Sequence, residues 1–208
     1  MKQDVKELLI RSAIEVFADK GYRDGKIANI VKGAGANIAA VNYHFGSKDQ
    51  LFVAALRQAF SDADEVYPSR GELDESATAS ERIAALARAV LVRSFDDGKA
   101  GNYNRIMSRT MNMPGSPVEM ILTEVEDFEL KYLSEALSEF LETSSTQIIG
   151  WALAIFISLA TMISKCPLSA KEHLFSKEPK PSQVNAMIES QIEVIFAALK
   201  SIPKQFPK

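Results

Sequence analysis

Cysteine and histidine are scarce in this 208-residue chain, and their scarcity excludes several kinds of site. Cys166 is the only cysteine, so no disulfide can form within the chain and no cysteine cluster can bind a metal. Neither His44 nor His173 has a carboxylate or cysteine at the helical spacing that a metal site requires. We therefore expect neither a metal nor a cofactor, and the cysteine usage agrees with a reducing cytoplasm.

Long uncharged segments are also few. The longest runs from Thr143 to Ser164, but its strongly apolar part, Ile148–Ile163, has only 16 residues. A helix that spans a membrane needs about 20. The N-terminal residues MKQDVKELL lack the uncharged core of a signal peptide. These observations predict a buried helix covered by a second subunit, no membrane segment and a cytoplasmic location.

Charge is unevenly distributed along the chain. Hydrophobic residues make up 47% and charged residues 25%, which is typical of soluble globular proteins. The net charge is −3, yet residues 1–60 hold nine Lys/Arg and six Asp/Glu. The remaining residues hold 15 and 21. A basic head on an acidic body suits an anionic partner for the head alone.

Apolar residues recur at helical spacing throughout, and no alternating strand pattern or internal repeat is present. The predicted fold is therefore all-α. Residues 61–79, which are polar and contain Pro68 and Gly71, indicate a loop or boundary. The helices are expected near residues 5–20, 27–33, 37–43, 47–60, 83–97, 103–111, 118–140, 148–163 and 184–199.

The segment GAGANIAAVNYHFGSK, residues 33–48, contains the most informative pattern. A glycine turn joins two short helices, which is typical of a helix-turn-helix. Asp24 is a candidate N-cap for the first of these helices and Asn37 for the second. Ser47 and Gln50 form a capping box for the long helix that follows. Gly33 and Gly35 are not a dinucleotide loop, because no strand precedes them and the third glycine is missing.

The helix after the turn has two different faces. Ile38, Val41 and Phe45 form an apolar stripe, and the polar groups point the other way. Asparagine can read adenine, alanine methyl groups can contact thymine, and Tyr or His can reach phosphates. Lys26 and Lys48 begin the neighbouring helices, where phosphate is favoured. Alternatively, these polar side chains only solvate a small helical bundle.

The remaining groups suggest no catalysis. A catalytic site needs a nucleophile, an acid–base pair or a metal, and no such combination is present. The acidic run from Glu124 to Glu129 lies on a helix with a regular apolar stripe, which favours a solvated face over a metal site. We expect that the protein is not an enzyme.

Residues 8–56 resemble the DNA-binding domain of the TetR family of transcriptional regulators. The family pattern is matched in order by Ala13, Phe17, Gly21-Tyr22, Ile30, Ala34-Gly35, Tyr43-His44-Phe45, Ser47-Lys48 and Leu51. The sequence ANIAAVNYHFGSK, together with MPGSPVE at 113–119, also resembles the CecR-like subgroup.

The resemblance implies a helix-turn-helix domain over residues 1–50 and a helical effector-binding and dimerisation domain over 51–208, with a linking helix at 47–65. It implies a homodimeric repressor that a small-molecule effector releases from a palindromic double-stranded DNA operator. Two other readings stay open: a helical adaptor that binds protein and has lost DNA affinity, and a small-molecule-binding enzyme.

This chain departs from the family pattern at several DNA-facing positions. Gly25-Lys26 replaces a hydroxyl pair, and Ile38-Ala39-Ala40 replaces Lys-Gly-Thr. Asn42 replaces an aromatic residue. The operator should therefore differ from those of other members. The expected base readers are Asn37, Ala39, Ala40 and Asn42, and the expected backbone contacts are Lys26, Tyr43, His44 and Lys48.

The resemblance also places an effector pocket and a dimer interface in the remaining helices. The pocket is expected among the helices of residues 80–163, and we predict an apolar or amphipathic effector. The candidate pocket residues are Phe95, Tyr103, Met107, Met111, Phe128, Trp151 and Phe156, although each could be ordinary core. The expected dimer interface consists of Trp151, Ile155, Leu159, Met162, Ile188, Ile192, Ile195 and Phe196.

Overall fold

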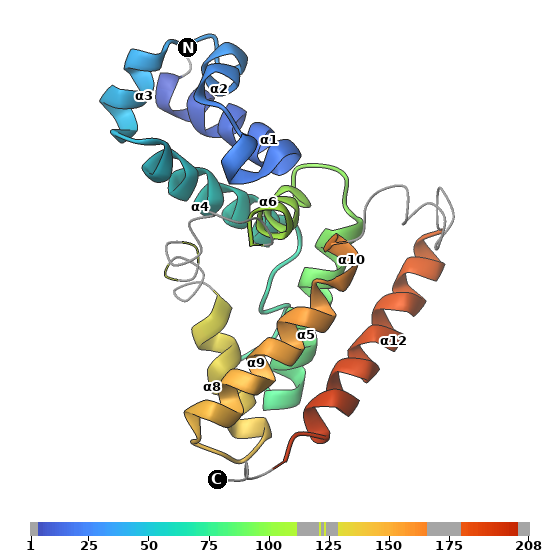
Figure 1. The fold of residues 1–208 in the computed structure, drawn as a ribbon. Helices are drawn as coiled ribbons and strands as arrows, with labels where there is room; N and C mark the ends of the chain where they lie inside the picture. Colours follow the sequence, from blue (N-terminus) through green and yellow to red (C-terminus); the bar gives the residue numbers. More distant parts are fainter. Residues whose placement is uncertain (1–3, 112–120, 122, 124–128, 166–179, 204–208) are drawn as a thin grey trace. The chain divides into compact units, whose positions relative to one another are not determined.

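The computed structural model describes residues 4–111, 121, 123, 129–165 and 180–203, and these residues form helices without strands. The predicted all-α fold is confirmed. Two compact units are present (Figure 1). The N-terminal unit comprises Met1–Val66 and Asp96–Glu124, and the C-terminal unit comprises Tyr67–Phe95 and Val125–Lys208. The predicted boundary at residue 50 separates a DNA-binding domain from an effector-binding domain. That functional division stays a prediction.

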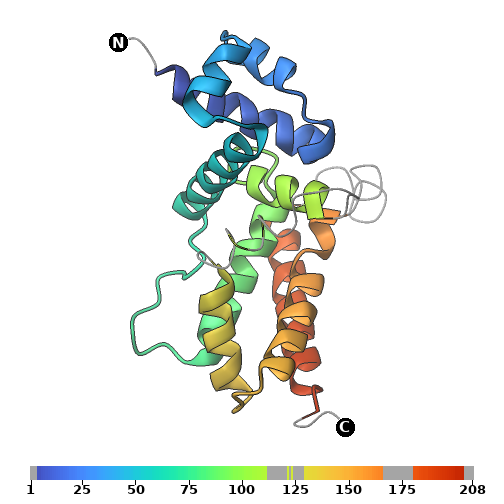
Figure 2. The same ribbon diagram turned by 60° about the vertical axis from the view of Figure 1, so that its left-hand side comes forward.

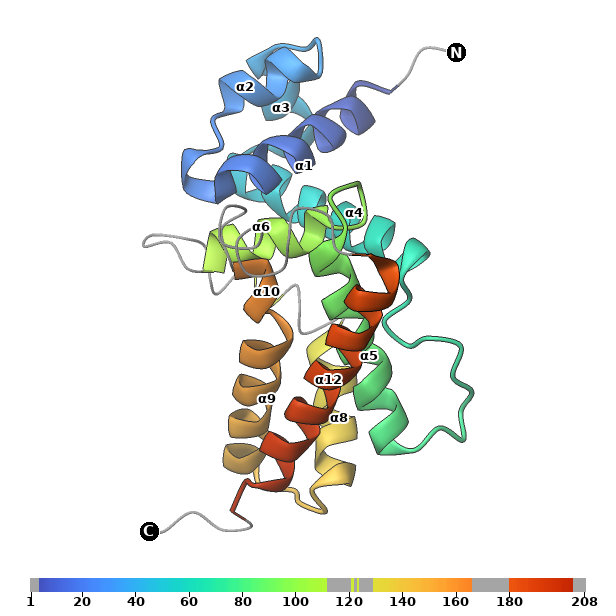
Figure 3. The ribbon, with the colours of Figure 1, turned by 90° about the vertical axis from the view of Figure 1, so that its right-hand side faces the viewer.

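The N-terminal unit is organised around its first helix. α1 (Val5–Asp24) packs against α2 (Ile27–Gly33), α3 (Ile38–Phe45), α4 (Lys48–Val66) and α6 (Asn102–Met111). Figure 3 shows α2 and α3 beside α1 in this unit. The first part of the loop predicted at 61–79 is helical, because α4 continues to Val66.

Capping side chains fix where several of these helices begin. The Asn37 side chain accepts a hydrogen bond from the Ala40 amide at 3.0 Å, and Ser47 Oγ accepts one from the Gln50 amide at 3.1 Å. The predicted Asn37 cap is therefore confirmed, and so is the Ser47 side-chain bond of the predicted capping box. The predicted Asp24 cap is wrong, because α2 starts after Lys26 without a side-chain cap and Asp24 pairs with Arg23 at 3.0 Å.

Two glycines adopt the left-handed backbone that their turns require. Gly21 has φ 70° and breaks the regular geometry within α1 after residue 20, close to the predicted helix end. Gly35 has φ 61° in the turn between α2 and α3. Residues with a Cβ are disfavoured at such angles, so these positions shape the path of the chain around α2.

An aromatic cluster fills the core between α1 and α4. The Phe17 and Phe52 rings meet edge to face at 5.1 Å, and Tyr22 meets Phe52 at 5.2 Å. The Tyr22 hydroxyl donates to the Asp49 carboxylate. The pKa of Tyr22 is raised to about 12, mainly by burial and also by the hydrogen bond to Asp49 and the negative charge of that carboxylate.

The C-terminal unit is a bundle of α5 (Ala79–Phe95), α8 (Lys131–Phe140), α9 (Thr146–Ala160), α10 (Met162–Lys165) and α12 (Pro181–Lys200). α5 packs against α8, and α9 packs against α12 (Figure 2). Ile83, Leu137, Phe156 and Ile195 are among its buried core residues. Most of the first part of the helix predicted at 118–140 lies outside the described residues. Within the described ranges, every helix falls short of the length and apolar character needed to cross a membrane.

A buried arginine joins several segments of this unit. Arg93 of α5 is fully buried, and its Nη1 lies 3.1 Å from Glu129 Oε1. Its Nη2 donates to the Tyr67 carbonyl at 2.7 Å and to Ser69 Oγ at 2.9 Å. Ser69 Oγ also donates to Glu129 at 3.2 Å. The segment after α4 is thus held against α5 by charge-assisted hydrogen bonds, which are stronger than neutral ones.

Replacing Arg93 by methionine should lower the free energy of unfolding by about 3–5 kcal/mol, because Glu129 is left buried without its cation. Urea denaturation of the full chain measures this change. The matched control is Arg88→Gln on the same helix, which breaks the exposed pair with Glu189 and should cost under about 1 kcal/mol. Equal losses for the two variants would contradict the assigned role of Arg93.

The raised pKa of Tyr22 links stability to alkaline pH. The folded state favours the neutral phenol, so the contribution to stability is complete below about pH 10 and is lost as pH rises toward 12. Asp49→Asn removes the carboxylate and should lower the pKa of Tyr22. Ultraviolet titration of tyrosinate, with Tyr22→Phe as the reference for the other tyrosines, measures this. An unchanged titration in Asp49→Asn would contradict the contact.

Candidate nucleic-acid interface

α2, the Gly35 turn and α3 form the predicted helix-turn-helix, and α3 has only eight residues. Val41 anchors α3, since its side chain is buried, and Phe45 is half-buried. The prediction is wrong for the remaining residue of the apolar stripe, Ile38, whose side chain is 56% exposed. Its position directly after the Asn37 cap turns it outward, and sequence reasoning missed it as a surface residue that could contact a thymine methyl group.

The predicted base readers are presented unequally. Ala39 and Asn42 are exposed, and Ala40 is half-buried. Asn37 is exposed, but its side-chain oxygen already accepts the Ala40 amide. Bidentate reading of adenine uses both the oxygen and the nitrogen of the asparagine amide. The cap fixes the orientation of the Asn37 amide and uses one lone pair of its oxygen, which leaves Asn42 the better candidate for bidentate reading.

The predicted backbone contacts Tyr43 and His44 follow at the end of α3. Tyr43 is 85% exposed, which is unusual for a large aromatic side chain. The His44 ring is half-buried and meets Tyr43 edge to face at 4.9 Å. Lys26 is exposed where α2 begins. These side chains give the α2–α3 surface donors suited to an anion.

Lys48 is held in place by its neighbours. Its Nζ lies 4.5 Å from the centre of the Tyr22 ring and donates to the Arg23 carbonyl at 3.3 Å. Burial lowers the pKa of Lys48, while the charges of Asp49 and Asp24 act in the opposite direction. The ammonium group is thus oriented before any ligand arrives, which reduces the entropy lost on binding.

The candidate effector residues are divided between the two units, and the predicted pocket stays a prediction. Tyr103 and Met107 belong to the N-terminal unit, where Tyr103 is buried against Phe60. Phe156 is a core residue of the C-terminal unit and Phe95 packs against that core. Trp151 is 52% exposed on the outside of α9, so it does not line an interior pocket. Phe128 and the Met111 side chain lie outside the described residues.

Cavities within the C-terminal unit lie elsewhere. One of about 360 Å³ is lined by Phe140, Ile148 and Ile202, among others. Another of about 490 Å³ is lined by Ser80, Phe140 and Phe196. Neither cavity is lined by a predicted effector residue. Sequence spacing does not separate the two cases, because a large aromatic side chain can be buried in a core as well as at the wall of a pocket.

The predicted dimer interface divides into exposed and buried halves. Trp151 and Met162 are exposed, and Ile155 and Leu159 are half-buried. The residues on α12 differ: Ile188, Ile192 and Ile195 are buried in the core of their own unit, and Phe196 packs edge-on against Phe140 at 5.5 Å. Helical spacing shows that a face is apolar without showing which partner covers it, and here the isoleucine face of α12 turns inward.

The comparisons with known proteins agree with this geometry. Residues 9–55 match the bacterial regulatory proteins of the tetR family. The HTH-type transcriptional regulator BetI of Stenotrophomonas maltophilia is 31% identical over 94 residues, which cover 45% of each chain. The chain thus spans about half the length of this curated relative.

Solved structures extend the likeness in fold to nearly the whole chain. The regulator FadR of Bacillus subtilis, solved with stearoyl-CoA, has a TM-score of 0.62 at 16% identity and covers 96% of this chain and 99% of its own. The regulator CifR, solved with a 26-bp operator, has a TM-score of 0.60 at 19% identity and covers 98% and 99%.

The predicted resemblance is confirmed for the N-terminal segment, and the proteins that match are named as regulators. The CecR-like resemblance stays a prediction. The helix-turn-helix of this chain, braced by α1 and α4, lies within the segment that matches the tetR family of bacterial regulatory proteins, residues 9–55.

Proposed function

We propose that this chain is a homodimeric transcriptional repressor that inserts α3 of each subunit into the major groove of a palindromic operator. The observation that carries the proposal is the outward face of α3, where Ala39, Asn42 and Tyr43 are exposed on a helix anchored by Val41. A helix of this kind can enter the major groove of B-form DNA.

The surrounding residues suit contacts to the DNA backbone. Tyr43 and His44 end α3, Lys48 begins α4, and Lys26 precedes α2. Contacts of this type set the position of α3 in the groove, while base contacts set the sequence preference. Asn42 is the principal base reader in this proposal, and the exposed Ile38 and Ala39 supply contacts to thymine methyl groups.

Dimerisation is supported by an exposed face of α9. Trp151, Ala154 and Ser158 of α9 and Met162 at the start of α10 are exposed at successive helical spacings, and Ile155 lies among them half-buried. No charged residue occurs between Thr143 and Ser164. α12 packs beside α9, and Gln191 donates to the Leu159 carbonyl at 3.1 Å. On α12, the outward Val194 replaces the buried isoleucines as the proposed contact.

The proposed effector is a small apolar or amphipathic molecule that binds the helical C-terminal domain and releases the operator. The class is supported by the FadR relative, whose ligand stearoyl-CoA joins a long apolar chain to a polar group. Phe95 and Phe156 of the predicted set remain candidates for contact within the C-terminal unit.

Selection of bound DNA from a random pool tests the function directly. We expect an enriched palindrome whose half-sites are separated by about one helical turn or a multiple of it, as two-fold symmetric docking requires. A pool without an enriched motif would overturn the proposal. Enrichment of a single half-site would instead overturn the dimeric mode of binding.

Asn42→Ala should relax specificity at one base position in each half-site. The expected cost is about 1–3 kcal/mol at that position, because the bidentate contact is lost. Operators with each substitution at that position, titrated by fluorescence anisotropy, measure the effect. The same loss on every DNA sequence would show that Asn42 does not read a base.

Lys48→Ala is the contrasting variant. It should weaken binding to all sequences and reduce the dependence of affinity on salt by about one counterion, as expected for a lost phosphate contact. Anisotropy titrations over a range of salt concentrations measure the slope. A slope equal to that of the unmodified protein would argue that Lys48 only packs against Tyr22.

Ala154→Glu should convert the dimer to a monomer, because it introduces a charge into an interface that contains none. Sedimentation equilibrium should then report the mass of a single chain, 22.9 kDa. Lys131→Glu on the exposed surface of α8 is the control and should leave the dimer intact. A dimer that tolerates Ala154→Glu would exclude the α9 face.

A further inference from the structure

A groove on the N-terminal unit is unused by the proposed operator contacts, apart from His44 at one edge. Its volume is about 510 Å³, within the range of small-molecule sites. α1 contributes Lys6 and Ile10, one helical turn apart, and the end of α3 contributes His44 and Phe45. α4 contributes one stripe at helical spacing: Gln50, Val53, Ala54, Arg57, Gln58 and Ser61.

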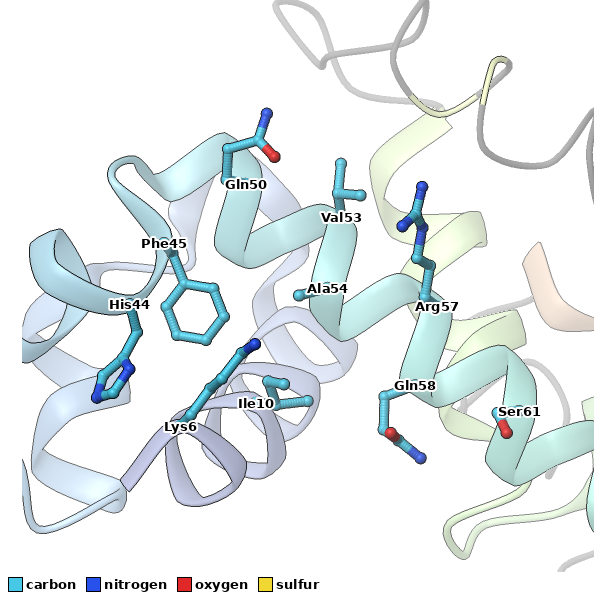
Figure 4. Close-up of a pocket in the computed structure, with 10 residues that line it drawn as sticks. All are labelled: Lys6, Ile10, His44, Phe45, Gln50, Val53, Ala54, Arg57, Gln58 and Ser61. Atoms are coloured by element: carbon cyan, nitrogen blue, oxygen red, sulfur yellow. The ribbon is translucent and has the colours of Figure 1, made fainter. Parts of the chain in front are cut away.

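The floor of the groove is apolar and incompletely covered. Figure 4 shows the Phe45 ring, Ile10 and Ala54 around the groove. Phe45, Ile10 and Ala54 are each half-buried, unlike the fully buried Phe17 and Phe52 of the neighbouring core. A bound apolar group would complete their burial, which is the usual driving force for binding in such sites.

The polar groups of the groove select the charge of the ligand. Its ten lining residues include the basic side chains of Lys6, His44 and Arg57, and none of the ten is acidic. Lys6 extends from α1 toward Ala54 beside the Phe45 ring (Figure 4). An ammonium group above an apolar floor matches a ligand with an anionic head and an apolar body.

We propose that this groove binds a small amphipathic carboxylate, with the acid group at Lys6 and the apolar body over Phe45, Ile10 and Ala54. A DNA backbone fits less well, because phosphodiester groups gain nothing from the apolar floor. This site is separate from the effector site proposed for the C-terminal domain. Since His44 lines the groove, a bound carboxylate competes with the operator, a consequence that rests on the proposed function.

Methyl NMR of the full-length protein, titrated with sodium decanoate below its micelle concentration, tests the site. We expect saturable shifts of the Ile10, Val53 and Ala54 methyl signals. Decyltrimethylammonium and decan-1-ol, which have the same chain length, should bind more weakly. Shifts confined to methyl groups of the C-terminal unit, or equal binding of the cationic probe, would overturn the proposal.

Two variants and a matched control sharpen the result. Lys6→Gln should weaken decanoate binding about tenfold, as expected when a charged hydrogen bond is lost. Ala54→Phe should fill the groove and abolish the Ile10 shifts. Lys20→Gln removes an exposed lysine of α1 outside the groove and should bind decanoate normally. Equal weakening by Lys6→Gln and Lys20→Gln would reduce the effect to general charge and overturn the site.

The competition is measured separately by operator anisotropy. Decanoate should weaken operator binding by the unmodified protein and leave binding by Ala54→Phe unaffected. If no operator is bound at all, the proposed function fails while the NMR result still decides the groove. If operator alone shifts the Ala54 methyl signal and decanoate does not, DNA is the occupant and the carboxylate proposal is wrong.

Discussion

The burial of Val41 against the rest of the N-terminal unit is the contact on which the DNA-facing surface depends. An isolated helix of eight residues is not stable in water, because the cost of nucleation exceeds the gain from so few hydrogen bonds. α3 is helical because Val41 is buried and because Asn37 satisfies an amide at its start. Its outward side chains contribute nothing to that anchoring, so they can vary without loss of the fold.

A single residue also has several structural roles where α1 meets α4. Tyr22 packs edge-on against Phe52 and its hydroxyl group donates a hydrogen bond to Asp49. The Lys48 ammonium group lies over the ring of the same tyrosine. One aromatic residue thus links the hydrophobic core to a cation on the surface. Packing and electrostatics are coupled there, because a change in the core position of Tyr22 would also move the Lys48 ammonium group.

The sequence was sufficient for the all-α class, the helix-turn-helix and the caps at Asn37 and Ser47. Each depends on local chemistry: helical spacing, a glycine turn, or a side-chain acceptor close to the amide that it caps. The Asp24 cap failed because Arg23 offers that carboxylate a nearer charged partner. Such competition between neighbours is decided by geometry that a linear pattern does not contain.

Tertiary packing decided the rest. Ile38 and Ile192 are equally apolar, yet one is exposed and the other is buried in a core. Arg93 is fully buried, although charged residues are rarely buried unless they are paired. Its partner Glu129 lies 36 residues away along the chain. Partners at such separations follow from the fold, so no local pattern could have indicated them or the groove between α1, α3 and α4.

The uncharged outer face of α9 also bears on the solubility of a single chain. Exposed apolar surface of this kind promotes nonspecific association when nothing covers it. In the proposed dimer a second copy would cover this surface, and in a single chain Trp151 and Met162 are exposed to solvent. The solubility of the chain would then depend on how completely it dimerises, which is set by its concentration relative to the dissociation constant of the dimer.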